Sequence, residues 1–198
     1  MPPKSRSSFC QPRSQLPTRW RRELETILIT EAQIDRRVRQ LSRMIQRDYA
    51  PRELVVVALL TGTIMFLADL IRHLTLPLRL DCIGISTYRD GRVSGEPHFT
   101  KELSLDVKRR DVLLVDDILD TGKTLHRVVS KLRPLGPRTI RICVLLEKEA
   151  RRVENIRADY VGFTVPDLFV VGYGLDFAER YRNLPFIGVL RPHLYVAS

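Results

Sequence analysis

The chain has few cysteines, and they are far apart. Its 198 residues include three, Cys10, Cys82 and Cys143, and no two of them form a C-x-x-C pair. Zinc sites and small disulfide-bonded folds need paired, closely spaced cysteines, so the sequence argues against both. Because we interpret the thiols as reduced, we expect a cytoplasmic protein.

Long apolar runs are missing as well. The longest extends from Leu54 to Leu60, whereas a membrane-spanning helix needs about 20 consecutive apolar residues. The N-terminus also lacks the apolar stretch of a secretory signal. We therefore expect no membrane partner.

Acidic residues are absent from residues 1–22, which carry six of the 33 basic side chains together with several prolines and serines. The other residues hold 27 basic and 23 acidic side chains, so the net charge of +10 falls to +4 without this segment. Such a composition builds no core, and we expect a disordered basic tail. We do not expect a nucleic-acid partner. Residues 23–198 are long enough for a single domain with a full core.

Apolar runs of strand length alternate with segments of helical periodicity. Strands are predicted at residues 54–60, 78–87, 112–115 and 139–146, with shorter apolar pieces at 160–165, 169–172 and 186–190. Helices are predicted from Thr30, where Thr30 and Gln33 can form a capping box, and at 64–74 and 124–133. Residues 88–100 are rich in glycine and charge and are predicted to form a long mobile loop. The alternation indicates an α/β fold with a central parallel sheet flanked by helices, whose ligands bind at the carboxyl ends of the strands.

The segment VLLVDDILDTGKT, residues 112–124, lacks the first glycine of a nucleotide-binding P-loop. That motif places a glycine five positions before the Gly-Lys-Thr, and this chain has Asp117 there. An ATPase site is therefore excluded. What the segment does contain is a buried strand, three carboxylates and a Thr-Gly-Lys-Thr turn into a helix.

These features predict a site for an anion beside hydroxyl groups and a metal ion. The backbone N–H groups and the dipole of a helix N-terminus attract an anion. Gly122 allows close approach of the backbone, and Thr121 and Thr124 add hydroxyl donors. Asp116 and Asp117 are adjacent in a strand, so they point to opposite faces and cannot do the same work.

The segment resembles the phosphoribosyl-pyrophosphate signature of type I phosphoribosyltransferases. An aspartate followed by Thr-Gly-Lys-Thr is most similar to the hypoxanthine-guanine branch of that family. The resemblance implies the type I phosphoribosyltransferase fold with a core at about residues 50–165 and a small hood lobe built from the N-terminal and C-terminal segments. It also leads us to expect a homo-oligomer, a dimer or a tetramer.

The resemblance also implies roles for the residues around the phosphoribosyl group. Asp116 and Asp117 are expected at the ribose hydroxyls and Mg²⁺, and Asp120 is expected to assist proton transfer at purine N7. Thr61 and Gly62 resemble the pyrophosphate loop, in which the family commonly has a non-proline cis peptide. The 5′-phosphate is expected in the loop made by Asp120, Thr121, Gly122, Lys123 and Thr124.

Further matches extend along the chain and complete the implied site. Thr87 and Tyr88 resemble the start of a lid that excludes water, and Arg182 resembles an arginine that faces pyrophosphate. The purine-binding set implied by the family is Lys148 at the 6-oxo group, Phe169 stacked on the ring, Val170 at its edge and Asp176, which also binds Mg²⁺.

Together these matches predict a Mg²⁺-dependent purine-salvage enzyme. The expected reaction moves the 5-phosphoribosyl group of phosphoribosyl pyrophosphate to N9 of hypoxanthine or guanine. A regulator that keeps the phosphoribosyl-pyrophosphate site and binds nucleic acid is the alternative, and the presence of Asp120 argues against it. An adenine-specific transferase is disfavoured because it would not use Asp120 and Lys148 in this way.

Overall fold

The computed structural model describes residues 16–89 and 92–195. The chain divides into two compact units. The core unit is Arg37–Asp167, and the terminal unit is Met1–Arg36 with Leu168–Ser198. Among the described residues, no helix has both the length and the apolar character that crossing a bilayer requires.

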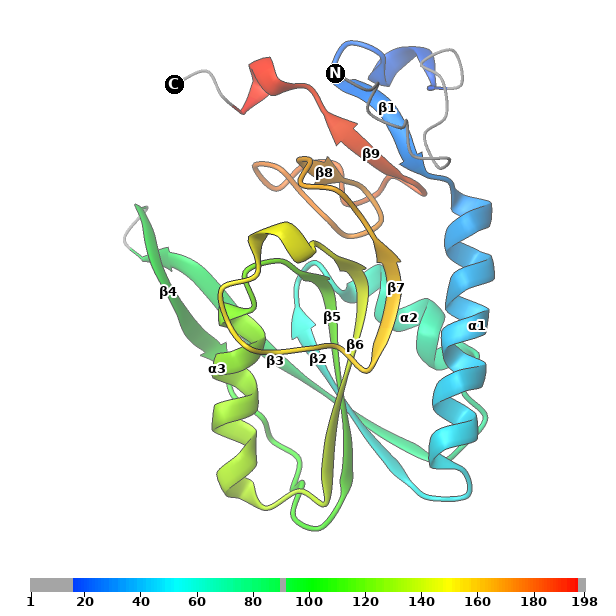
Figure 1. Cartoon of the computed structure of the whole chain (residues 1–198), viewed down its shortest axis with the longest axis vertical. Coiled ribbons are helices and arrows are strands. Elements are labelled where there is room, and N and C mark those ends of the chain that lie inside the picture. The colour runs from blue at the N-terminus through cyan, green and yellow to red at the C-terminus, as the bar shows by residue number, and fades with distance from the viewer. Residues whose placement is uncertain (1–15, 90–91, 196–198) are drawn as a thin grey trace. The chain divides into compact units, whose positions relative to one another are not determined.

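The core unit contains a six-stranded sheet in the order β4-β3-β2-β5-β6-β7 (Figure 1). Five of its strands are parallel, and β4 is antiparallel to its neighbour β3. The expected parallel sheet is therefore confirmed, with one antiparallel edge strand. The strands are β2 (Leu54–Leu60), β3 (Leu78–Arg89), β4 (Arg92–Lys101), β5 (Asp111–Leu119), β6 (Thr139–Glu147) and β7 (Tyr160–Thr164).

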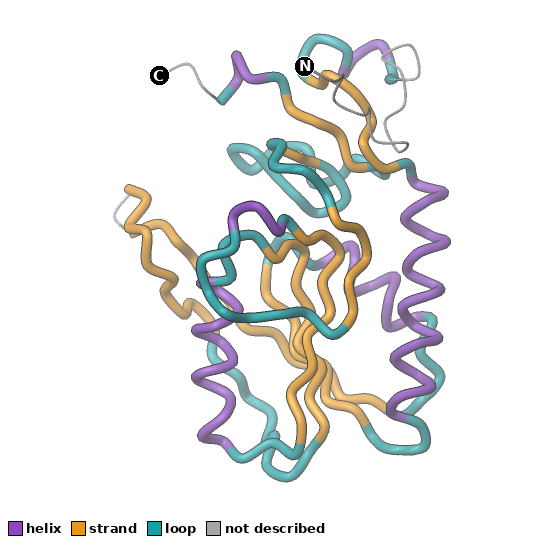
Figure 2. Tube along the Cα trace, viewed as in Figure 1, coloured by secondary structure: helices purple, strands orange, loops and turns teal. Residues whose placement is uncertain are grey.

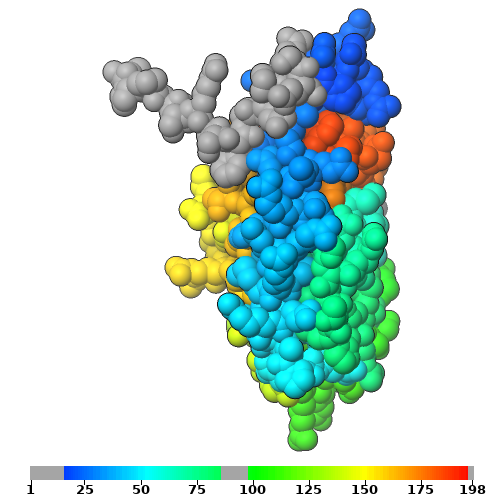
Figure 3. All heavy atoms as spheres, turned by 90° about the vertical axis from the view of Figure 1, so that its right-hand side faces the viewer, coloured from blue at the N-terminus to red at the C-terminus, as the bar shows by residue number. Residues whose placement is uncertain are grey.

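Helices cover both faces of this sheet (Figure 2). α1 (Glu31–Tyr49) and α2 (Ile64–Arg72) lie side by side on one face, where the hydroxyl of Ser42 donates to the carbonyl of Leu70 (Figure 3). α3 (Lys123–Leu132) covers the other face. The capping box at the start of α1 is confirmed, because the backbone N–H of Thr30 donates to Gln33 Oε1 at 2.8 Å and that of Gln33 to Thr30 Oγ1 at 3.3 Å.

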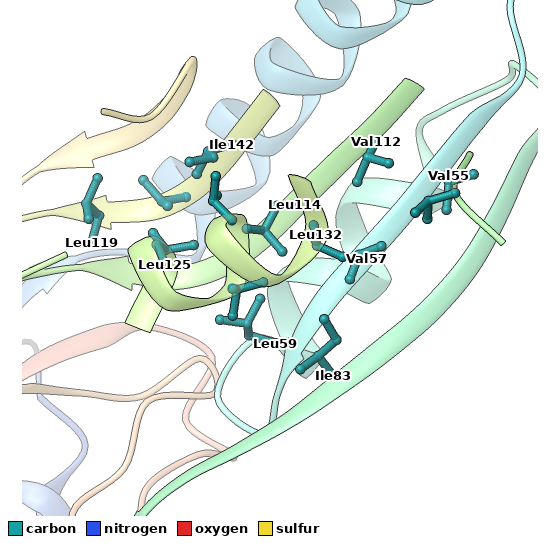
Figure 4. Close-up of a cluster of buried hydrophobic side chains, with 14 residues drawn as sticks. Val55, Val57, Leu59, Ile83, Val112, Leu114, Leu119, Leu125, Leu132 and Ile142 are labelled. Atoms are coloured by element: carbon teal, nitrogen blue, oxygen red, sulfur yellow. The ribbon is translucent and has the colours of Figure 1, made fainter. Parts of the chain in front are cut away.

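The side chains between α3 and the sheet form an apolar cluster of the core unit (Figure 4). Leu125 and Leu132 of α3 meet Val57 of β2 and Leu114 of β5 there. Burial of each such side chain contributes about 1.5–3 kcal/mol. This packing fixes α3, and with it the loop that connects β5 to α3.

Two boundaries differ from those that the sequence predicts. Residues 88–100 are not a long loop, because β3 and β4 form a hairpin with Tyr88 paired to Val93. Edge strands often carry charged residues, because charge prevents them from pairing with other chains. The same composition is typical of loops, so the sequence does not distinguish the two. β5 is longer than expected and runs to Leu119, so Asp116 and Asp117 belong to the strand itself.

The terminal unit has a small antiparallel sheet in the order β1-β9-β8. Its strands are β1 (Leu24–Ile29), β8 (Val170–Val171) and β9 (Ile187–Leu190). Their apolar side chains share a cluster with Tyr181 and Phe186. Short 3-10 helices complete the chain at Thr18–Trp20, Arg133–Leu135, Glu149–Arg151 and Pro192–Leu194.

The prediction of a disordered tail over residues 1–22 is wrong for its last part. Leu16 is only 1% exposed and packs in the same cluster as Leu24 and Val171. Trp20 contacts the ring of Tyr181, with ring centroids 5.7 Å apart. Apolar side chains spaced among prolines and arginines gave no periodic signal, so only the tertiary packing reveals them. Residues 1–15 lie outside the described residues.

Replacing Leu16 by alanine is expected to destabilise the protein by about 2–5 kcal/mol, the usual cost of truncating a buried leucine. Leu168→Ala is the matched control, since Leu168 is 38% exposed and should change the free energy of unfolding little. Urea unfolding of both variants measures the difference. Equal stability of the two would show that the segment around Leu16 does not contribute to the terminal unit's core.

Candidate active site

The loop between β5 and α3 presents a helix N-terminus without a side-chain cap. Gly122 is the N-cap of α3 in the left-handed conformation, with φ of 85°, and no side chain of the described structure caps the helix there. A Cβ at this position would lie 2.7 Å from Ile156 Cγ2, so glycine is required for space as well as for φ. The N–H of Lys123 makes a long hydrogen bond of 3.5 Å to Thr121 Oγ1. The following N–H groups of the first turn and the positive end of the helix dipole suit an anion.

A cavity of about 330 Å³ opens at this loop. It lies at the carboxyl ends of β2 and β5, which is where open parallel sheets bind ligands. It brings together Asp116, Asp117 and the residues of the 120–124 loop other than Lys123, all of which are candidate site residues in the sequence. Its lining is Leu59, Leu60, Gly62, Ile85, Asp116, Asp117, Ile118, Leu119, Asp120, Thr121, Gly122, Thr124 and Leu125.

Asp116 and Asp117 occupy different environments, as their alternation along β5 predicts. Asp116 is 7% exposed, and its Oδ1 accepts hydrogen bonds from the N–H of Asp117 at 3.0 Å and from Thr63 Oγ1 at 3.3 Å. Burial, and then the charge of Asp117, raise the pKa of Asp116 well above its usual value. Asp117 lies over Gly62, where a Cβ would be 1.8 Å from Asp117 Oδ2.

The turn between β2 and α2 adjoins these carboxylates. The Leu60–Thr61 peptide is cis, as the family resemblance implies. Thr61 is exposed, whereas Gly62 is half-buried and lines the cavity. The close contact with Asp117 explains why a glycine stands at this position.

Asp120 and Lys148 follow the neighbouring strands β5 and β6, whose last residues, Leu119 and Glu147, are paired. The Oδ1 atom of Asp120 is buried and has no hydrogen-bond partner among the described residues. Lys148 is 6% exposed, and its backbone N–H donates to Leu119 O at 2.9 Å. A buried carboxylate oxygen and a buried ammonium group thus follow adjacent strand ends.

Four of the candidate site residues, Phe169, Val170, Asp176 and Arg182, belong to the terminal unit. Phe169 stacks on Tyr195, with ring centroids 4.6 Å apart, and makes an edge contact with Phe177 at 5.6 Å. Asp176 Oδ1 lies 2.9 Å from Arg182 Nη2, and the same guanidinium donates through Nη1 to Gly174 O at 2.8 Å. Val170 is buried in β8.

The sequence matches known proteins over most of its length. The model of the phosphoribosyl transferase domain matches residues 26–178. The chain belongs to the phosphoribosyltransferase family. The hypoxanthine-guanine phosphoribosyltransferase of Bacillus subtilis (strain 168) is 43% identical over 174 residues, which are 87% of this chain and 97% of that protein. The enzyme of the same name from Staphylococcus aureus (strain MW2) is 41% identical over 174 residues, with the same two shares covered.

Solved structures of this phosphoribosyltransferase family have the same fold. A crystal structure of a hypoxanthine phosphoribosyltransferase from Staphylococcus aureus matches with a TM-score of 0.84 and 38% identity, covering 91% of this chain and 99% of that one. One from Bacillus anthracis, with a HEPES molecule in its active site, gives 0.80 and 39%, covering 85% and 98%. These matches confirm the expected type I phosphoribosyltransferase fold and place the chain in the hypoxanthine-guanine branch.

The donor set of this phosphoribosyltransferase suits a hard cation that brings ligands of its own. Among the described residues, no group of three or more His, Cys, Asp and Glu side chains could hold a metal ion. The adjacent carboxyl groups of Asp116 and Asp117 offer oxygen donors on the cavity wall. Mg²⁺ typically takes one or two carboxylates and completes its shell with water and substrate phosphates, so this pair fits it.

Two charged residues near the cavity gave no signal in the sequence of this phosphoribosyltransferase. Arg151 Nη1 lies 3.3 Å from Asp120 Oδ2, and Asp167 Oδ1 lies 3.6 Å from Lys148 Nζ. Both side chains are about half exposed and stand in a segment rich in charge. In sequence alone they look like ordinary surface residues.

The proposed lid residues lie partly outside the described structure of the phosphoribosyltransferase. The backbone of Thr87 and Tyr88 belongs to β3. Their side chains are outside the described residues, so a role in excluding water stays a prediction.

Proposed function

We propose that the protein transfers the 5-phosphoribosyl group of phosphoribosyl pyrophosphate to N9 of hypoxanthine or guanine, giving IMP or GMP and pyrophosphate in purine salvage. One observation carries the proposal. The buried Oδ1 of Asp120 has no hydrogen-bond partner among the described residues and stands directly beside the start of α3, which has no side-chain N-cap. An anion site and a hydrogen-bond acceptor stand next to each other there. This is the combination that a phosphoribosyl group and an adjoining purine require.

The phosphate end of the substrate binds in the 120–124 loop. Backbone N–H groups of this loop and the hydroxyls of Thr121 and Thr124 donate to the phosphate oxygens. Gly122 keeps the backbone open, and the charge of Lys123 adds to the dipole of α3. The support for this assignment is the cavity itself, which the loop lines.

Asp116 and Asp117 bind the ribose hydroxyls and Mg²⁺. Asp176 is proposed as a separate Mg²⁺ ligand. When bound, Mg²⁺ neutralises charge on the departing pyrophosphate. Thr61, Gly62 and Arg182 face the pyrophosphate.

Purine recognition is assigned to one charged donor, backbone groups, a carboxylate and an aromatic ring. Lys148 donates to the 6-oxo group, and the backbone of Val170 binds the edge of the ring. Asp176 completes the purine-binding set and also binds Mg²⁺. Phe169 stacks on the base with the ring face that Tyr195 does not cover.

The reaction passes through a ribose centre with oxocarbenium character. The carboxylates near the ribose stabilise that positive charge electrostatically. Asp120 accepts the proton of purine N7 through Oδ1 as N9 bonds to the ribose. Thr87 and Tyr88 are proposed to close over the site and exclude water, which would otherwise capture the ribosyl group.

Release of pyrophosphate on mixing the protein with hypoxanthine, Mg²⁺ and phosphoribosyl pyrophosphate tests the proposal. The nucleic-acid-binding regulator predicts binding without turnover, and the relatives described above give it no support. A cytoplasmic location and a dimeric or tetrameric assembly stay predictions from the sequence.

Gly62→Ala is expected to raise KM for phosphoribosyl pyrophosphate and to lower the free energy of unfolding by about 1–3 kcal/mol, the usual cost of overpacking. The added methyl group would need the space of Asp117 Oδ2. Initial rates at varied phosphoribosyl pyrophosphate concentration measure KM, and urea unfolding measures the free energy of unfolding.

The same substitution in an Asp117→Ala background provides the control. With the carboxylate removed, the methyl group has room and should destabilise the protein little, because the two residues are in contact and their effects are not additive. An equal cost of Gly62→Ala in both backgrounds would show that the contact with Asp117 is not the cause.

A further inference from the structure

Four charged side chains of the core unit follow one another at ion-pair distance. Arg151 Nη1 lies 3.3 Å from Asp120 Oδ2 and 3.8 Å from Asp167 Oδ1. Asp167 Oδ1 in turn lies 3.6 Å from Lys148 Nζ. The order Asp120–Arg151–Asp167–Lys148 alternates in sign, so each neighbour attracts the next. We refer to these four residues as the charge chain.

The two ends of the charge chain are the groups proposed to hold the purine, and its two inner members are not. The Asp120 and Lys148 side chains are 29% and 7% exposed, whereas Arg151 and Asp167 are 50% and 51% exposed. Half-exposed ion pairs contribute little to folding stability. The contacts of Arg151 and Asp167 therefore need another explanation than stability.

Arg151 makes the two oxygens of Asp120 unequal. Oδ2 faces the guanidinium, while Oδ1 is buried without a hydrogen-bond partner among the described residues. A carboxylate held at one oxygen by a planar, always charged group loses its freedom to rotate. Oδ1 is thereby left to accept a hydrogen bond from a ligand.

Asp167 acts on Lys148 in a similar way. A buried ammonium group needs a compensating charge, and Asp167 supplies one. At 3.6 Å the contact is an ion pair and too long for a strong hydrogen bond. The three N–H donors of Lys148 are consequently not used up by Asp167 and can serve an oxygen acceptor.

The geometry points to Arg151 and Asp167 as positioning residues. Arg151 orients Asp120 toward the N7–H donor of a 6-oxopurine, and Asp167 orients Lys148 toward its 6-oxo acceptor. This inference rests on the proposed function. It adds that these half-exposed residues outside the cavity lining set the hypoxanthine kinetics through their charged neighbours.

Arg151→Gln and Asp167→Asn test the inference, because each removes a charge and keeps most of the side chain. Arg151→Gln is expected to lower kcat/KM for hypoxanthine about tenfold, and Asp167→Asn to raise KM for hypoxanthine about tenfold, within the range for residues in contact. KM for phosphoribosyl pyrophosphate should change less than about twofold in both, because the 120–124 backbone is unchanged. Arg151→Lys should restore part of the loss.

Double variants separate positioning from a general structural effect. If Arg151 acts through Asp120, adding Arg151→Gln to the Asp120→Asn variant should lower kcat/KM for hypoxanthine by less than about twofold. Adding Asp167→Asn to the Lys148→Met variant should likewise lower kcat/KM by less than about twofold. Arg157→Gln is the matched control, since Arg157 is exposed in the same segment and outside the charge chain; its kinetics should equal the wild type's.

Each outcome decides a different statement. Absence of pyrophosphate release by the wild-type protein would overturn the proposed function itself. An active wild type with unchanged kinetics in Arg151→Gln and Asp167→Asn would overturn only the positioning roles. The positioning roles would also be overturned if the losses in kcat/KM of the single variants multiplied fully in the double variants. The same holds if KM for hypoxanthine and KM for phosphoribosyl pyrophosphate rose equally.

Discussion

Asp120→Asn is expected to lower kcat by about 10²–10⁴, the range for a group that transfers a proton in the transition state. Asparagine has the size of aspartate, but its amide cannot accept the N7 proton. Steady-state kinetics with hypoxanthine measure the loss. Asp106→Asn is the matched control, because Asp106 is exposed and lies outside the cavity lining.

The affinity for phosphoribosyl pyrophosphate should change little in Asp120→Asn. The loop is held by its backbone, since Arg152 Nε donates to Asp120 O at 3.1 Å and the N–H of Val153 donates to Thr121 O at 3.0 Å. Neither contact involves the replaced side chain. A variant with near-wild-type kcat would exclude the role of Asp120, and a large loss of substrate affinity would assign it to binding instead.

Features that depend on neighbouring residues could be predicted from the sequence. β2 begins and ends where the apolar run from Leu54 to Leu60 does. The capping box of α1 needs only Thr30 and Gln33, which are three residues apart. The helix after Gly122 was predicted at 124–133, within one residue of the observed bounds of α3. In each case the physical cause is contained in one short segment.

Features that depend on distant partners could not. β4 is a strand because β3 provides its hydrogen bonds, not because its own residues favour one. Leu16 is buried by β1 and β9, which lie far apart along the chain. Arg151 approaches Asp120 only because the segment after β6 returns to the end of β5. The cis peptide at Thr61 was expected from the family resemblance alone.

Lys148 is expected to determine which purines the enzyme accepts. An ammonium group has three donors and no acceptor, so it suits the 6-oxo group of hypoxanthine or guanine. Adenine presents an amino group at that position, and donor would then meet donor. Because Lys148 is 6% exposed, the mismatch would leave a buried charge without its acceptor. Polar sites reject such partners strongly.

Lys148→Met is therefore expected to raise KM for 6-oxopurines while KM for phosphoribosyl pyrophosphate stays the same. The binding free energy of the 6-oxopurine should weaken by about 1.5–3 kcal/mol, the range for a hydrogen bond to a charged group. Methionine keeps the length of the side chain and removes its donors. Lys108→Met, at an exposed position, controls for the loss of a positive charge.

Values of kcat/KM for hypoxanthine, guanine, xanthine and adenine on the wild type and Lys148→Met decide the assignment. The wild type should use hypoxanthine or guanine and use adenine barely at all. In Lys148→Met the ratio of kcat/KM for 6-oxopurines to kcat/KM for adenine should fall, because the 6-oxopurines lose a hydrogen-bond donor that adenine does not use. A wild type that prefers adenine would overturn the substrate class. Unchanged 6-oxopurine values in the variant would overturn the role of Lys148 and leave the phosphate site as proposed.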